Sequence, residues 1–196
     1  MKNYLIVGLG NPGCLYKKTR HNIGFFLLDQ ISKKYSLNFV NKKFGLLSKF
    51  YYNNHLIFFL KPTTFINESG RSVKYWMKKK NVLLENILII SDDFYLHFGF
   101  IRFRGEGRSG GHNGLKSIEQ EIKSLKYSRL RIGIRNKNFI SNKKNYVLEN
   151  WNTEEEKFLY LKSEKFIKMI FSFVLNGLQK TMNLFNGKIE KPCSLG

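Results

Sequence analysis

The chain opens with a short apolar run, YLIVGL at residues 4–9, that leads straight into a glycine-rich turn. Residues 10–25 read GNPGCLYKKTRHNIGF. A short apolar run bounded by glycine is typical of a buried strand. Open α/β sheets place their active sites in the loops at the carboxyl ends of such strands. This stretch therefore predicts a central strand that is followed at once by a functional loop.

The glycines of this turn suggest a nucleotide phosphate site, but the detailed pattern argues against one. The third glycine of a G-x-G-x-x-G fingerprint falls at Gly13, yet Pro12 removes a backbone N–H where a phosphate needs a donor. No helix is expected to begin at Gly13, and the acidic residue at a suitable distance, Asp29, falls within the first expected helix. We therefore expect no cofactor, and a nucleotide-dependent oxidoreductase is not favoured.

Strand-like and helix-like segments alternate along the rest of the chain. The patterns predict a hairpin with Asn53-Asn54 at its turn. They also predict that Leu125 lies on the apolar face of one helix, and that Thr153 caps the last helix of the chain. The expected strands are 4–9, 46–52, 55–61, 86–91, 98–104 and 129–134, and the expected helices are 23–35, 68–80, 113–125 and 153–178. This alternation predicts an α/β fold, in which a twisted mixed β-sheet is flanked by helices.

The length and composition fit one soluble domain. A chain of 196 residues, 42% of them hydrophobic, is long enough to bury a core and is not disordered. We expect a single domain over residues 1–187 and a flexible tail over 188–196. No apolar run approaches the ~20 residues of a membrane span, and the N-terminus lacks a signal peptide's apolar segment. Cys14 and Cys193 are expected to be free thiols, so the expected location is the cytoplasm.

The charge balance points to a polyanionic partner. Lysine and arginine total 34 against 14 acidic residues, which gives a net charge of +20. Such an excess favours nucleic acid, and no basic amphipathic helix with a tryptophan-rich face suggests a membrane. The chain has no alanine and is rich in lysine, asparagine, isoleucine and phenylalanine, as an AT-biased genome would produce. The arginines are therefore better indicators of a partner than the lysines.

A histidine and a pair of aspartates are the candidate catalytic groups. His21 precedes the first expected helix, and Asp92 and Asp93 follow the apolar strand NILIIS. A carboxylate that fixes a histidine tautomer and favours its charged form makes the histidine a general base. No G-x-S-x-G elbow is present, and neither cysteine has an identifiable electropositive setting, so such a base would activate water. A purely structural His21 stays open as the alternative.

Three asparagines and a phenylalanine accompany these groups in loops. Asn11 lies in the first turn, Asn113 follows GRSGGH at a helix start, and Phe65 and Asn67 lie in KPTTFINESG. An amide side chain can donate to or accept from a substrate, and the N–H groups at a helix start favour anions. Ordinary turn, loop or helix-start residues are the alternatives. The sequence shows no metal-ligand spacing, so no metal is expected.

In these residues the sequence resembles the bacterial peptidyl-tRNA hydrolases. The resemblance covers roughly residues 3–185, and five blocks carry it in order. They are LIVGLGNPG-x-x-Y-x-x-T-R-H-N-I-G-F, KPTTFIN-x-SG, the aspartate pair, GGHNGLKSI and RLRIGI. The resemblance implies a monomeric, metal-free esterase of translation that cuts the bond between a stalled peptide and the 3′ end of its tRNA.

The resemblance also implies roles for the polar residues. His21 would be the general base and Asp92 the carboxylate that stabilises it. Asn11 would distinguish a blocked, peptide-like amine from a free one. Asn67 and Asn113 would bind the substrate and help position the water and the developing oxyanion.

Further positions would contact the substrate at a greater distance from the reaction. Tyr16 and Phe65 match substrate-contacting aromatics, and Arg104 and Arg131 match positions that hold tRNA phosphates. Adjacent side chains of a strand point to opposite faces. Asp93 is therefore expected to point away from His21, where it would cap a turn or face the tRNA.

The sequence departs from the family pattern at three positions. The aspartates continue as DDFYLHF where D-x-x-D-L-P is usual, which places Tyr95 at the later acid. Arg108 enters the glycine-rich loop, and Arg135 ends the strand RLRIGIR where glycine is common. A non-catalytic RNA-binding relative of the same fold is the alternative function. Such a relative is expected to have lost His21 or Asp92.

Overall fold

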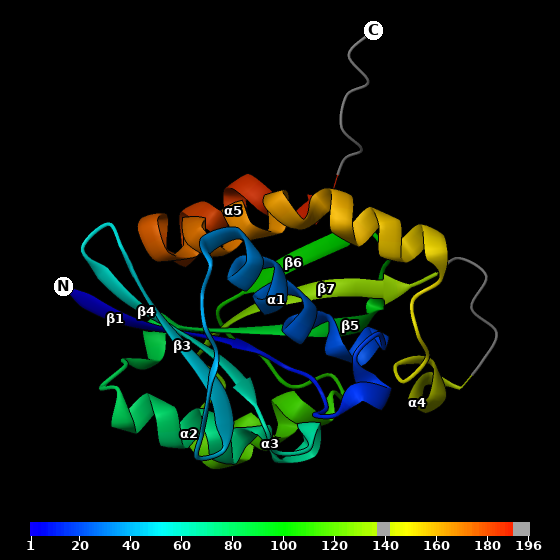
Figure 1. Cartoon of the computed structure of the whole chain (residues 1–196). Coiled ribbons are helices and arrows are strands. Elements are labelled where there is room, and N and C mark those ends of the chain that lie inside the picture. The colour runs from blue at the N-terminus through cyan, green and yellow to red at the C-terminus, as the bar shows by residue number, and fades with distance from the viewer. Residues whose placement is uncertain (137–141, 190–196) are drawn as a thin grey trace, which may run out of the picture.

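The computed structural model describes residues 1–136 and 142–189 of the chain, which form a single α/β domain (Figure 1). The strands are β1 (Lys2–Gly8), β2 (Val40–Lys42), β3 (Gly45–Tyr52), β4 (His55–Pro62), β5 (Ile87–His97), β6 (Phe100–Arg104), β7 (Ser128–Arg135) and β8 (Gly187–Lys188). The α-helices are α1 (Ile23–Tyr35), α2 (Ser69–Lys79), α3 (Asn113–Ile122), α4 (Lys143–Tyr146) and α5 (Thr153–Phe185). The described residues also form the short 3-10 helices η1 (Cys14–Tyr16), η2 (Arg20–Asn22) and η3 (Ile66–Glu68).

The eight strands form one mixed sheet in the order β2-β3-β4-β1-β5-β7-β6-β8. The four inner strands β4, β1, β5 and β7 are parallel, and the outer pairings β2–β3, β3–β4, β6–β7 and β6–β8 are antiparallel. The expected mixed sheet and the central position of the first strand are therefore confirmed. Because the inner strands are parallel, their carboxyl ends all lie at one end of the sheet.

Helices cover both faces of the sheet. Helices α1 and α5 lie on one face, and α2 and α3 lie on the other (Figure 1). The side chains of β1 alternate between the two cores: Tyr4 and Ile6 pack with α1 and α5, and Leu5 and Val7 pack with α2 and α3. An inner strand covered on both faces reads as a continuous apolar run, and this explains the sequence YLIVGL.

The hairpin between β3 and β4 has the predicted turn. Asn53 and Asn54 both adopt positive φ angles, 44° and 60°. Two such residues in a two-residue loop form the type I′ turn that matches the twist of a hairpin, and asparagine tolerates this conformation better than most residues.

The long helix α5 begins with a different cap from the one predicted. The N-cap is Asn152, whose side chain accepts a hydrogen bond from the Glu155 backbone N–H at 2.8 Å, while Glu155 accepts from the Asn152 backbone at 3.0 Å. This reciprocal pair is a capping box, and it moves Thr153 into the helix. The helix continues to Phe185 across a kink at Gly177, which has a φ of 76°.

Two further details differ from the sequence-based expectation. Leu125 lies beyond the end of α3 and is 41% exposed, because α3 ends at Ile122 and its C-cap residue, Lys123, adopts the left-handed conformation. At the other end of the chain, Lys188 pairs with β6 and Ile189 is buried, so the packed domain extends past the expected boundary at residue 187. The remainder of the expected tail, with Cys193, lies outside the described residues.

No helix within residues 1–136 and 142–189 combines the length and apolar character needed to cross a membrane. Cys14 is a free, exposed cysteine in the same part of the chain.

Two glycines bring α1 into backbone contact with β1. A Cβ atom built on Gly24 would lie 2.3 Å from the Leu9 backbone nitrogen, and one built on Gly8 would lie 2.3 Å from the Gly24 carbonyl oxygen. The start of α1 can therefore lie directly against the carboxyl end of β1. This contact places the segment that precedes α1 beside the loop that follows β1.

We predict that Gly24→Ala lowers the free energy of unfolding by about 1–3 kcal/mol or more, because the added methyl group meets backbone atoms that cannot move aside. Helix propensity alone would favour alanine by about 1 kcal/mol, so the sign of the change identifies the cause. Chemical denaturation measures it. Gly105→Ala is the matched control, since its methyl group would meet only the end of the Leu178 side chain. Equal stability of the two variants would contradict the prediction.

Candidate active site

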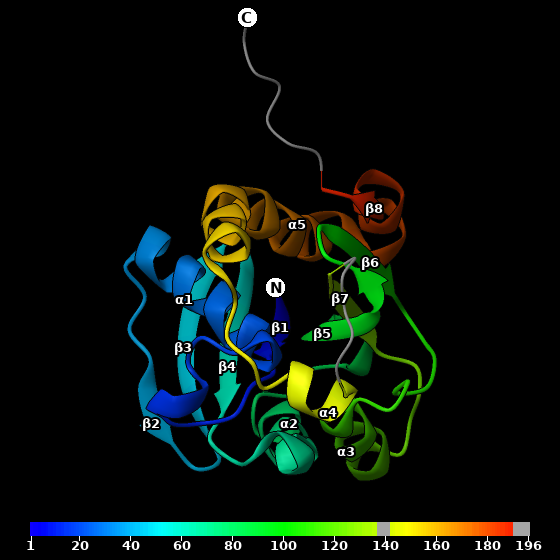
Figure 2. The same ribbon diagram turned by 90° about the vertical axis from the view of Figure 1, so that its right-hand side faces the viewer.

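A cleft of about 510 Å³ lies at the carboxyl ends of the inner strands. In Figure 2 this end of the sheet faces the viewer, with α4 in front and the start of α3 below it. Most of the residues singled out from the sequence line this cleft, namely Asn11, His21, Phe65, Asn67, Asp92, Asn113 and Arg131. Two do not: Tyr16 is half-buried in η1, and Arg104 is exposed at the end of β6.

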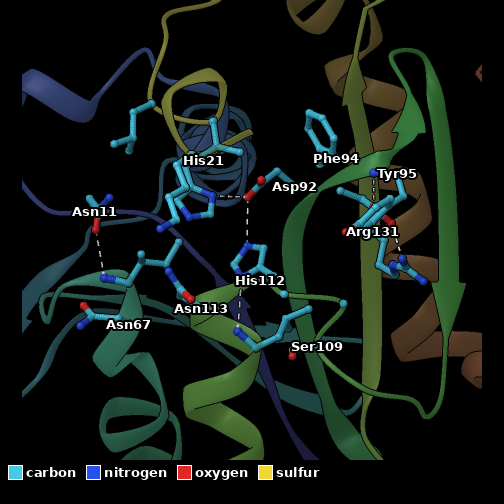
Figure 3. A pocket seen from close by; sticks show the side chains of 18 of the residues that line it. Asn11, His21, Asn67, Asp92, Phe94, Tyr95, Ser109, His112, Asn113 and Arg131 are labelled. Carbon is cyan, nitrogen blue, oxygen red and sulfur yellow. Dashed lines mark hydrogen bonds and ion pairs between the residues drawn. The ribbon is translucent and has the colours of Figure 1, made fainter. Parts of the chain in front are cut away.

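The imidazole of His21 contacts the carboxylate of Asp92. His21 belongs to η2, and its Nδ1 lies 2.7 Å from Asp92 Oδ1 (Figure 3). Both side chains are buried. A carboxylate at this distance accepts the proton of Nδ1, which leaves Nε2 as the nitrogen with the lone pair. The expected pairing of His21 with Asp92 and not with Asp93 thus agrees with the geometry.

A second histidine binds the same carboxylate oxygen. His112 Nε2 lies 3.0 Å from Asp92 Oδ1. Its other nitrogen, Nδ1, accepts hydrogen bonds from the backbone N–H groups of Gly114 at 3.1 Å and Leu115 at 3.3 Å, and thereby caps α3. A nitrogen that accepts from two N–H groups carries no proton, so the proton of His112 is on Nε2 and points at Asp92.

The sequence reasoning assigned no role to His112. Its motif GGHNG was interpreted through Asn113 and the helix start alone. The available signal was the residue type at the N-cap, where serine, threonine, aspartate or asparagine is the usual choice. A histidine at this position indicates that the ring has a second task.

The carboxyl group of Asp92 is kept ionised by the imidazoles of His21 and His112. Burial alone would raise the pKa of this carboxyl group, but the positive potential and the hydrogen bonds of His21 and His112 outweigh burial. The pKa of Asp92 therefore lies far below its ordinary range. The carboxylate is therefore ionised at neutral pH.

His21, Asp92 and His112 also form a group of potential metal ligands. One atom of each residue lies within 4.8 Å of the others, and imidazole and carboxylate suit zinc. However, both imidazoles already approach the same oxygen at hydrogen-bond distances, and His112 uses its other nitrogen as a helix cap. A cation would have to replace both hydrogen bonds. The geometry therefore fits a hydrogen-bonded triad better than a metal centre.

Asn11 faces the cleft with its NH₂ group. Its Oδ1 accepts a hydrogen bond from the Ile66 backbone N–H at 3.0 Å, and this bond fixes which end of the amide is the oxygen. The Asn11 backbone exchanges two 2.9 Å hydrogen bonds with the side chain of Asn22 in η2. The sequence suggested an amide that both donates and accepts. In the structure the oxygen is engaged, so Asn11 can offer a substrate two donors.

Two more amides stand on the same wall of the cleft. Asn67 in η3 and Asn113 at the start of α3 are both exposed, and Figure 3 shows them on the side of the cleft where Asn11 lies. Phe65 is 58% exposed beside them. Asn11, Asn67, Asn113 and Phe65 give this wall hydrogen-bonding groups and an aromatic face. None of these four side chains is charged.

The opposite wall carries an ion pair. Arg131 Nη2 lies 2.6 Å from Asp93 Oδ2, and Asp93 Oδ1 accepts from the Tyr95 backbone N–H at 2.9 Å. Asp93 was expected to cap a turn or to face the tRNA. Its Oδ1 accepts a local bond within β5, and its contact with Arg131 was not foreseen. The aspartates also lie within β5, which continues to His97, because Asp92 and Asp93 still pair with Ile132 and Gly133 of β7.

A buried arginine fixes the segment that carries His21. Arg20 Nη2 lies 2.8 Å from Glu155 Oε2, and Nη1 donates to the Asn150 carbonyl at 3.1 Å. The guanidinium group also lies over the ring of Tyr146, 4.2 Å from its centroid. The neighbouring His21 backbone N–H donates to the Val147 carbonyl at 2.8 Å. Residues 146–155 therefore hold η2 in place.

The chain is similar to proteins of one family over nearly its whole length. The family model described as peptidyl-tRNA hydrolase matches residues 5–192. A peptidyl-tRNA hydrolase of Azobacteroides pseudotrichonymphae is 46% identical and covers 93% of this chain and 98% of its own length. One from Bacteroides fragilis is 42% identical, with coverages of 94% and 99%. The crystal structure of peptidyl-tRNA hydrolase from Acinetobacter baumannii superimposes with a TM-score of 0.87 at 33% identity, covering 95% and 96% of the two chains.

We predict that the two histidines respond differently to the loss of the shared carboxylate. In the unaltered protein, ¹⁵N NMR at mildly alkaline pH should show the proton of His21 on Nδ1 and that of His112 on Nε2. In Asp92→Ala, His21 should lose its preference for the Nδ1–H form, because the hydrogen bond from Nδ1 to Asp92 is lost. His112 should keep its form, because its cap bonds to α3 remain. Protonation of His112 at Nδ1 in the unaltered protein would contradict this interpretation.

Proposed function

The chain belongs to the peptidyl-tRNA hydrolase family, and on this premise we propose how its cleft hydrolyses the ester bond that joins a peptide to the 3′ end of a tRNA. The observation that carries the proposal is the hydrogen-bonded group His21–Asp92–His112 beside a wall of amide donors. Asp92 and His21 are both present, so the residues that a non-catalytic relative is expected to lack are retained.

His21 activates water in this proposal. Nε2 takes a proton from a water molecule as the water attacks the ester carbonyl, and the ring becomes an imidazolium cation. Asp92 lies 2.7 Å from the other nitrogen and stabilises this cation, since it stays ionised. The proton then passes to the leaving 3′ oxygen of the tRNA. His112 acts as a positioning residue, because it holds the Asp92 oxygen from the second side.

The asparagines recognise the acyl part of the substrate. A peptidyl-tRNA has an amide carbonyl at the position where an aminoacyl-tRNA has a free, largely protonated amine. The NH₂ group of Asn11 can donate to that carbonyl but not to an ammonium group. Asn67 and Asn113 donate to the ester oxygen as negative charge develops on it. Phe65 offers an apolar surface to the peptide.

The arginines bind the tRNA. In β6 the exposed residues Arg102 and Arg104 alternate with buried ones, and they pair across the strands with Arg131 and Arg129 of β7. Arg131 also lines the cleft, so this group of arginines adjoins it and matches phosphate charges. Tyr16 is outside the cleft lining, so a contact from it would be with substrate beyond the ester. We expect the enzyme to act as a monomer in the cytoplasm, without a metal or cofactor.

We predict that His21→Ala lowers the rate of hydrolysis of N-acetyl-aminoacyl-tRNA by at least ~100-fold, the usual contribution of general base catalysis. Binding of tRNA should change only slightly, because the imidazole contacts no phosphate. His55→Ala, at the opposite end of β4, is the matched control and should keep its activity. Added EDTA should leave the unaltered enzyme active. Near-normal turnover by His21→Ala would overturn the mechanism.

We predict that Arg104→Ala weakens tRNA binding and lowers the slope of log Kd against log salt by roughly 0.9, the value for one lost phosphate contact. The affinity for different tRNAs should fall by the same factor, because a phosphate carries no sequence information. Lys49→Ala is the control, since Lys49 is exposed on β3 at the far side of the sheet. An unchanged slope in Arg104→Ala would place the phosphate site elsewhere.

A further inference from the structure

One aromatic side chain in the cleft has no part in the mechanism described above. Tyr95 follows Asp92 by three residues on β5, lines the cleft, and is 59% exposed. The ring of its neighbour Phe94 packs edge-on against both the Tyr95 ring, with centroids 5.8 Å apart, and the Tyr146 ring, with centroids 6.0 Å apart. Large aromatic side chains are mostly buried, so an exposed one beside the catalytic group requires an explanation.

The position of the Tyr95 ring is prepared by the surrounding structure. Its backbone N–H donates to Asp93 Oδ1 at 2.9 Å, and Asp93 is itself bound to Arg131 at 2.6 Å. On the other side the ring faces the glycine-rich loop, where a methyl group built on Gly110 would lie 4.0 Å from the ring carbon Cε2. A side chain at this position would come into contact with the ring, and glycine avoids that contact. A ring held in this way loses little conformational freedom when a ligand packs on it.

The location of Tyr95 shows which part of a substrate would meet it. In Figure 3 the amides of Asn11, Asn67 and Asn113 lie on one side of the His21–Asp92–His112 group, and Tyr95 and Arg131 lie on the other. The ester must lie at the catalytic group in the middle. An acyl chain that extends toward the asparagines leaves the nucleoside to extend toward Tyr95 and the exposed arginines of β6.

We propose that Tyr95 is a specificity-determining residue that stacks on an unpaired base at the 3′ end of the tRNA. This inference rests on the proposed function and names the binding site for the nucleic-acid half of its substrate. Unpaired bases are bound in proteins mainly by stacking on aromatic rings, and this contact tolerates any base because every base has a π face. The neighbouring Arg131 adds positive charge beside the ring for the adjoining phosphate.

Kinetics provide the first test. Tyr95→Leu should raise KM for N-acetyl-aminoacyl-tRNA by at least ~5-fold, the lower end of the effect of losing one base–aromatic stack. The value of kcat should change little, because the ring does not touch the reacting atoms. Tyr95→Phe should behave like the unaltered enzyme, since it keeps the aromatic face. Tyr51→Leu is the matched control, because Tyr51 is similarly exposed, at 65%, but lies on β3.

Fluorescence tests the stack directly. An RNA hairpin with an unpaired 3′ end, substituted with 2-aminopurine at each unpaired position in turn, should show quenching at one position when the enzyme binds. Quenching should persist with Tyr95→Phe and Tyr51→Leu and should be lost with Tyr95→Leu. Absence of quenching at every position with the unaltered enzyme would overturn the proposal whether or not a variant folds.

Substrates with different acyl groups distinguish base stacking from a contact of Tyr95 with the peptide. They also show whether a failure concerns this inference or the proposed function. A KM effect of Tyr95→Leu that depends on the size of the N-acetylated amino acid, with quenching retained, would assign Tyr95 to the peptide and overturn the proposal. Failure of the unaltered enzyme to hydrolyse any N-acetyl-aminoacyl-tRNA would instead overturn the proposed function. Normal hydrolysis with an unchanged KM in Tyr95→Leu would remove only the stacking role.

Discussion

The site depends on one buried oxygen atom, Oδ1 of Asp92, which accepts hydrogen bonds from two imidazoles. An isolated carboxylate with so little exposure would take up a proton, because burial penalises the charged form. The two N–H donors reverse this tendency and keep the group ionised. A hydrogen bond between an N–H donor and a charged carboxylate is directional in a site of low dielectric. The same bonds therefore also fix the ring planes of His21 and His112. One oxygen thus sets the charge and the geometry of the catalytic group.

The arrangement links three parts of the chain that are distant in sequence. His21 belongs to the segment before α1, Asp92 to the central strand β5, and His112 to the cap of α3. Because His112 bonds to Asp92 with one nitrogen and to the backbone of α3 with the other, the end of the glycine-rich loop cannot shift without disturbing the carboxylate. The helix cap is therefore also a part of the catalytic framework.

Several local features of the fold were predictable, although the exact ends of α3 and α5 were not, and most long-range contacts could not be foreseen. The turn at Asn53-Asn54 follows from the conformation that asparagine tolerates, and the buried strands follow from their apolar runs. The contact of His21 with Asp92 was expected only through the family resemblance, since strand periodicity could not choose between Asp92 and Asp93 in a segment that is apolar on both faces. The second bond from His112 could not be foreseen, because it requires the loop after β6 to fold back across β5. For the same reason the orientation of the Asn11 amide became clear only from its bond to η3.

The bond between Arg20 and Glu155 has a consequence for biosynthesis. The two residues are separated by 135 positions, and they join the segment that carries His21 to the first turn of α5. A chain emerging from the ribosome can form the hairpin and several inner strands early, but this clamp cannot close until the start of α5 has been released. Such a late, non-local closure delays assembly of the catalytic group until most of the domain exists. In the nascent chain, therefore, the segment that carries His21 is fixed only after more than three quarters of the chain has been synthesised.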